Sequence, residues 1–179
     1  MLRIVSQGMS LAALAAAFLA APALQAQKTD AAPIAPVPAQ IGAARKVFIS
    51  NAGVDGTARQ DLDRFAGPDE AYNRFYSAMK SWGRYELVAA PADADLVFQI
   101  RFTAPLTDCG DKTGASYAPQ LDLAILDART HFRLWTITDP VEGAHLKATW
   151  ERNFGAGMAS LVDDIKKLTL QATTGPAAR

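Results

Sequence analysis

The side chains that could do chemistry are few in this sequence and lie far apart. The 179 residues include one cysteine, Cys109, and two histidines, His131 and His145. A catalytic thiol needs a base beside it, and neither histidine is close to Cys109 in the sequence. The histidines are also too far apart to form a helical zinc-ligand pair, and a single cysteine forms no thiolate cluster. We therefore predict no catalytic residue, no metal and no cofactor.

The acidic residues next to Cys109 form a candidate loop site. Asp108 and Asp111 lie in residues 107–114, where glycine and short polar residues predict a loop. Their carboxylates could bind a cation, although the spacing lacks the Asp-x-Asp-x-Asp-Gly pattern of calcium loops. This site gives an alternative function: a small cation-dependent hydrolase or ligand-binding protein that uses loop 104–118.

Charge and leader composition restrict the compartment and the partners. Lysine plus arginine number 18 and aspartate plus glutamate number 18, so no bulk positive charge is available to bind nucleic acid. Residues 1–26 contain an apolar run that is shorter than the about 20 residues of a membrane span. Small residues follow it, which is the pattern of a cleaved signal peptide. We expect a periplasmic or secreted protein with no transmembrane segment after cleavage. Because no cysteine lies near the cut, we also expect that it is not a lipoprotein.

The rest of the chain divides into a linker, one domain and a tail. Prolines at positions 33, 36 and 38 predict a Pro/Ala-rich disordered linker over residues 27–44. Residues 45–171 have the length of a single α/β domain. Residues 172–179 are predicted to be a disordered tail.

Hydrophobic periodicity predicts the elements of that domain. Residues 96–102 alternate, with Leu96, Phe98, Ile100 and Phe102 on one face. The other predicted elements are strands at 46–50, 85–88, 120–127 and 132–138, and helices at 69–82 and 153–170. This order predicts an α+β fold, a two-layer α/β sandwich with a mixed sheet of four to five strands and two helices packed on one face.

The orientation of the last strand decides what the far face of the sheet presents. Leu134 alternates with Trp135 and Ile137, so both faces of the strand carry large apolar groups. If the helices cover Leu134 together with Phe98, Ile100 and Leu123, the opposite face carries the apolar residues Val97, Leu126, Trp135 and Ile137. Arg101 and Arg133 then rim a partly apolar patch of the kind found at protein contacts. If the strand is reversed, Trp135 and Ile137 belong to the core.

Several segments resemble a group of small, secreted, uncharacterised bacterial proteins. The resemblance is carried by residues 72–88, 94–101, 123–130, 134–135 and 153–168. A looser resemblance, through the Gly-x-Tyr, Ala-Asp-Leu-Val, Asp-x-x-Thr and Leu-Trp motifs, links the chain to envelope accessory domains related to the amino-terminal domain of TolB and to CsgG-type secretion proteins. It implies a non-catalytic binding or accessory domain of the cell envelope. We expect its partner to be an unknown envelope protein or a second copy of the chain. The resemblance implies no active-site residue.

Overall fold

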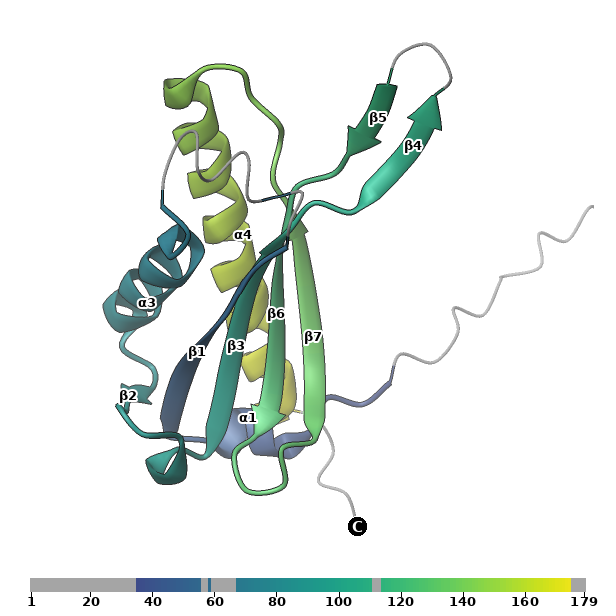
Figure 1. Ribbon diagram of the computed structural model, residues 1–179. Helices are drawn as coiled ribbons and strands as arrows, with labels where there is room; N and C mark the ends of the chain where they lie inside the picture. Colours follow the sequence, from purple (N-terminus) through teal and green to yellow (C-terminus); the bar gives the residue numbers. More distant parts are fainter. Residues whose placement is uncertain (1–34, 56–57, 59–66, 111–113, 175–179) are drawn as a thin grey trace, which may run out of the picture. The chain divides into compact units, whose positions relative to one another are not determined.

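The computed structural model describes residues 35–55, 58, 67–110 and 114–174. The predicted signal peptide and residues 27–34 of the predicted linker lie outside these described residues. The elements are, in chain order, α1 (Ala39–Ala43), β1 (Lys46–Val54), α3 (Glu70–Trp82), β2 (Glu86–Leu87), the 3-10 helix η1 (Pro91–Asp93), β3 (Leu96–Thr103), β4 (Leu106–Gly110), β5 (Gly114–Tyr117), β6 (Gln120–Asp127), β7 (Arg133–Pro140) and α4 (Lys147–Thr174) (Figure 1).

Five of the strands form one mixed sheet in the order β2-β1-β3-β6-β7. β1 runs parallel to β2 and β3, whereas β6 is antiparallel to both β3 and β7. Because adjacent parallel strands need a crossover connection, α3 lies between β1 and β3 in the chain. β4 and β5 pair separately as a two-stranded sheet. The predicted α+β fold with a mixed sheet is confirmed.

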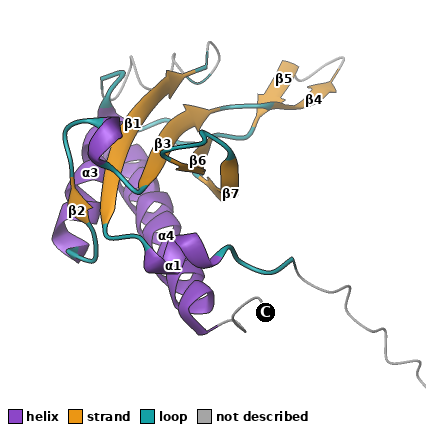
Figure 2. Ribbon diagram, turned by 90° about the horizontal axis from the view of Figure 1, so that it is seen from below, coloured by secondary structure: helices purple, strands orange, loops and turns teal. Residues whose placement is uncertain are grey.

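The helices lie on one side of the five-stranded sheet, and Figure 2 shows this from below. The helices pack on this side because every second residue of β3 is apolar and buried there. Aromatic rings fill the space between the layers. The Phe154 ring of α4 stacks on Trp150 at 4.7 Å between centroids and lies 5.4 Å from Phe102 of β3. No described element covers the opposite face of the sheet.

Helix α1 replaces part of the predicted disordered linker. Its Ile41 is fully buried, and the Tyr85 hydroxyl donates a hydrogen bond to the Ile41 carbonyl oxygen at 3.2 Å. A Cβ atom at Gly42 would come within 2.9 Å of Thr173 Cγ2, so α1 packs closely on the end of α4. A five-residue helix has little stability of its own, so these contacts stabilise it. The linker prediction is therefore wrong for residues 39–43.

The carboxyl-terminal helix is longer than predicted at both ends. It begins at Lys147 rather than near residue 153, and Trp150 in its first turns is buried in the core. It continues to Thr174, so the predicted tail is helical over residues 172–174, while residues 175–179 lie outside the described part. Among the helices that the structure describes, none combines the length and the apolar composition that a membrane span requires.

Two glycines of α4 provide a test of how closely this helix approaches the end of β7. A Cβ atom at Gly157 would lie 3.1 Å from the Pro140 carbonyl oxygen and 3.0 Å from Val141 Cγ2, whereas one at Gly155 would meet nothing closer than 4.0 Å. We expect Gly155→Ala to raise the free energy of unfolding by about 1 kcal/mol through helix propensity. Gly157→Ala should lower it by about 1–2 kcal/mol, because the backbone must move. Urea unfolding measures both, and equal stabilisation by the two variants would contradict this packing.

Candidate functional site

The sheet face away from the helices carries a row of half-buried apolar side chains. Phe48 of β1 pairs with Val97 of β3, and Val97 pairs with Leu126 of β6. Residues paired in register lie on the same face, so the three side chains are neighbours. Arg133 lies opposite Leu126 on β7, and Arg101 lies further along β3; both are exposed. We call these five residues the open-face patch.

Polar side chains occupy the other end of the same face and bond to one another. Asp122 of β6 accepts hydrogen bonds from the hydroxyl groups of Thr103 at 2.7 Å and Thr138 at 2.8 Å. The Gln120 side-chain amide donates to the same carboxylate at 3.1 Å. The carboxylate of Asp122 therefore has its donors within the sheet, whereas the apolar row at the other end has no described cover.

Strand β7 has the reverse of the orientation that the predicted patch requires. Trp135 pairs with Ile125, and Ile137 pairs with Leu123, and both partners are fully buried on the helix side. The side chain of Ile137 is itself 9% exposed. Trp135 and Ile137 therefore do not lie on the face where the sequence placed them.

A register shift explains this reversal. Arg133 lies opposite Leu126 and Trp135 lies opposite Ile125, which leaves Leu134 as an extra residue between the two pairs. An extra residue of this kind interrupts the alternation of side chains along the strand. Arg133 consequently shares the open face with Arg101, while Trp135 lies on the helix side.

The candidate loop site belongs to the separate hairpin. In the backbone pairing of β4 with β5, Asp108 lies opposite Ser116 and Cys109 lies opposite Ala115. These two residues are therefore in a strand rather than in the predicted loop. The side chains of Asp108 and Cys109 and the whole of Asp111 lie outside the described residues, so the loop site and the alternative function that uses it stay predictions. His131 and His145 are both exposed, the former in the β6–β7 turn and the latter before α4.

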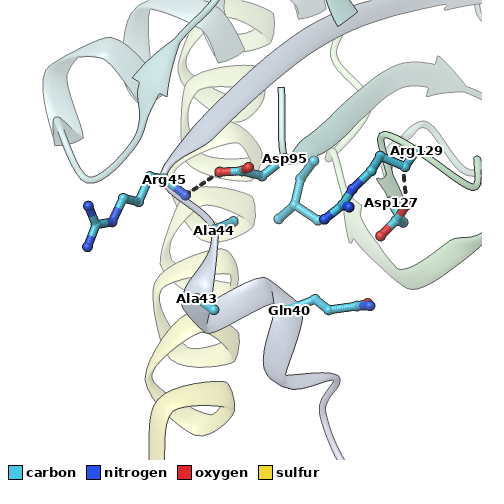
Figure 3. A pocket seen from close by; sticks show the side chains of 8 residues that line it. Gln40, Ala43, Ala44, Arg45, Asp95, Asp127 and Arg129 are labelled. Carbon is cyan, nitrogen blue, oxygen red and sulfur yellow. Dashed lines mark hydrogen bonds between the residues drawn. The ribbon is translucent and has the colours of Figure 1, made fainter. Parts of the chain in front are cut away.

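A pocket of about 330 Å³ lies where β1 and β3 begin and β6 ends (Figure 3). The Asp95 carboxylate, which precedes β3, turns to the backbone of the chain entering β1. Its Oδ2 atom accepts hydrogen bonds from the backbone N–H groups of Arg45 at 2.8 Å and Lys46 at 2.9 Å. These two bonds hold the pKa of Asp95 below its ordinary value.

The second carboxylate of this pocket, Asp127, shapes the β6–β7 turn. Its Oδ1 atom accepts hydrogen bonds from the Thr130 backbone N–H at 2.7 Å, the Arg129 backbone N–H at 2.9 Å and the Thr130 hydroxyl at 3.0 Å. The bond from the Thr130 N–H is the main reason why the pKa of Asp127 lies below its ordinary value. A general acid needs a raised pKa, so the two carboxylates of this pocket are suited to fixing the backbone rather than to proton transfer near neutral pH.

Asp139 is the residue in the described chain that sequence reasoning missed. It follows Ile137 by two positions on β7 and therefore faces the helix layer. It is 5% exposed, and its Oδ2 atom has no hydrogen-bond partner among the described residues. Its position two residues after Ile137 could have predicted that it is buried on the same face as Ile137. That prediction requires the correct orientation of β7, which the sequence left open. In the described ranges no group of three or more His, Cys, Asp and Glu side chains could hold a metal ion.

Comparisons with known proteins concern the fold alone. No family model matches the chain, and no curated protein is significantly similar to it in sequence. One similar solved structure is protein XCC0632 from Xanthomonas campestris, of the family DUF330, which is 14% identical over 73% of this chain and 86% of that chain, with a TM-score of 0.42. Lipoprotein GNA1162 from Neisseria meningitidis is 13% identical over 69% and 99%, with a TM-score of 0.37. Uncharacterized lipoprotein B from Nitrosomonas europaea is 15% identical over 74% and 86%, with a TM-score of 0.36.

These names bear on two expectations from the sequence. The expected resemblance to uncharacterised bacterial proteins is consistent with the names of these structures. The looser resemblance to TolB and CsgG-type domains is not shown. The prediction that the chain is not a lipoprotein rested on the absence of a cysteine near the expected cut. Two of the three similar structures are named lipoproteins, which contradicts that prediction, and we withdraw it.

The orientation of β7 predicts different costs for two adjacent residues. Ile137→Ala removes a buried side chain opposite Leu123 and should lower the free energy of unfolding by about 2–4 kcal/mol. Thr136→Ala, on the open face, should change it by less than about 1 kcal/mol. Thermal or urea unfolding checks both, and comparable costs would show that Ile137 does not face the core.

The Asp95 carboxylate predicts a defined pH dependence of stability. Since the pKa of Asp95 is lower in the folded protein, its ionised form stabilises the fold above the pKa of the unfolded chain. This contribution disappears as the pH falls through the folded pKa. Asp95→Asn should therefore lower stability near pH 7 by less than about 1 kcal/mol, because solvent screens an exposed carboxylate. The difference from the wild type should shrink below about pH 4 in pH-dependent urea unfolding, and a difference that is constant with pH would contradict the assignment.

Proposed function

We propose that this chain is a secreted or periplasmic, non-catalytic binding or accessory domain of the cell envelope. It acts by protein contact through the open-face patch, and its partner is an envelope protein or a second copy of the chain. The location is supported by the leader-like composition of residues 1–26.

One observation carries the contact role: a row of apolar side chains on a sheet face that no described element covers. A sheet that packs on one face only usually presents polar residues to water on the other. Here Phe48, Val97 and Leu126 form a half-buried apolar row instead. Apolar surface next to exposed arginines is the composition of protein contacts, where arginine is enriched.

The two ends of the open face also differ in how much they would gain from a contact with another protein. The polar end around Asp122 satisfies its own hydrogen bonds with Thr103 and Thr138. Covering the apolar row with another surface would lower the free energy, because it removes apolar side chains from water. A partner is therefore expected to cover the apolar row of the open-face patch. The polar group around Asp122, which lies opposite Arg101, should stay in solvent.

Site-specific cross-linking in the cells that produce the protein tests this function. A photo-reactive phenylalanine analogue at position 126 should give a discrete cross-linked product, whereas the same analogue at position 151, on the exposed side of α4, should give none. Adding Arg133→Glu to the position-126 protein should reduce the product by about tenfold, as expected for a contact worth about 1.4 kcal/mol. The melting temperature should stay unchanged, because Arg133 is exposed.

Mass spectrometry of the product distinguishes an envelope protein from a second copy of this chain. Identical products from positions 126 and 151 would show that the cross-link reports random encounter. Absence of any product from position 126 would contradict the proposed contact surface.

A further inference from the structure

A carboxylate at the edge of the sheet is buried, and one of its oxygens has no hydrogen-bond donor among the described residues. Asp139 is 5% exposed, and no donor in the described chain reaches its Oδ2 atom. A buried charged oxygen is costly unless a donor or a cation lies beside it. The hydrogen bond to Asp164 is the main reason why the pKa of Lys167 is raised, and Asp139 contributes least. The Lys167 Nζ atom donates to Asp164 Oδ1 at 2.7 Å. The described part of the fold therefore leaves the Oδ2 atom of Asp139 without a donor.

Asp139 lines a pocket of about 310 Å³ between the end of β7 and α4. The pocket lies on the helix side of β7, so it is separate from the open-face patch, and the inference does not depend on the proposed function. Gly157 contributes to the wall, where a Cβ atom would come within 3.1 Å of the Pro140 carbonyl oxygen. The approach of the helix to the strand thus encloses the carboxylate.

The other polar groups that line this pocket add hydrogen-bond acceptors and negative charge. The Asn153 side-chain nitrogen donates to the Glu142 carbonyl oxygen at 3.2 Å, which leaves the Asn153 amide oxygen as an acceptor. Two exposed residues, Ser160 and Glu142, also line the pocket, and their side chains carry a hydroxyl group and a second carboxylate. No lysine, arginine or histidine lines the pocket. Its complement is therefore a positively charged donor.

We propose that this pocket binds a primary ammonium group, supplied either by a small alkylamine or by a lysine side chain. An ammonium group carries three N–H donors, which match the Asp139 carboxylate, the Ser160 hydroxyl and the Asn153 amide oxygen. A calcium ion fits less well, because it takes six or more oxygen ligands and two carboxylates line the pocket.

Melting of the full chain with a simple amine tests the site. Propylammonium chloride is the probe, and tetramethylammonium chloride at equal concentration is the control, since it has the same charge and no N–H donor. We expect propylammonium to raise the melting temperature by about 2–4 °C above the control. It should also shift the backbone amide NMR signals of Asn153 and Ser160.

Two variants separate Asp139 from the general effect of charge. Asp139→Asn keeps the shape of the side chain and should abolish the propylammonium effect. Asp163→Asn removes an exposed carboxylate of α4 that is bonded to Lys166 and should leave the effect intact. If Asp139→Asn fails to fold, Ser160→Ala provides the second test, because it alters an exposed position and should weaken the effect at least twofold.

The source of the ammonium group is settled by a pair of peptides. A capped Gly-Lys-Gly peptide that shifts the same NMR signals, when its Nε-acetylated counterpart does not, supports a lysine side chain as ligand. A response to propylammonium without a response to the peptide supports a small amine. The proposal is overturned if tetramethylammonium stabilises the protein equally, if the propylammonium effect survives in Asp139→Asn, or if calcium chloride alone gives the Asp139-dependent shift.

Discussion

The structure depends on one constraint, which is that the central strand β3 must bury every second side chain. Leu96, Phe98, Ile100 and Phe102 are all almost completely buried, and β3 pairs with β1 on one side and with β6 along its whole length on the other. A slip of one residue would turn all four side chains to the open face, so the register of both neighbours is strongly fixed. The helices then pack where this apolar surface lies.

The same constraint divides the surface of the domain into apolar and polar regions. Because α3 and α4 cover one face, the other face is left to Phe48, Val97 and Leu126 at one end and to the hydrogen-bonded group around Asp122 at the other. At the start of β3, Asp95 binds the backbone that enters β1. The carboxylates that the fold uses for its own backbone are thus distinct from Asp139, whose Oδ2 atom has no described partner.

Strand β7 shows how a single extra residue changes which side chains lie on each face of the sheet. With Leu134 inserted between the pairs of Arg133 and Trp135, the strand turns Ile137 and Asp139 to the helix layer and leaves Arg133 on the open face. Burial of Ile137 contributes to the core, while burial of Asp139 on the same side of the strand places an unpaired carboxylate in a pocket. The same alternation therefore buries Ile137, which stabilises the fold, and Asp139, whose burial lowers the stability of the fold.

Local pattern alone determined the elements whose signal repeats over many residues. The alternation of residues 96–102 and 120–127 and the helical spacing that ends at Trp82 are visible in the sequence. The glycine that follows Trp82 is visible too, and in the structure Gly83 has a positive φ of 67°. Tertiary structure decided the features that depend on contacts between distant residues or on one inserted residue. Helix α1 forms because Ile41 meets Tyr85 and Gly42 meets Thr173, contacts that no local window contains. The orientation of β7, and with it the burial of Asp139, depends on one inserted residue, since a period of two reverses when one position is added.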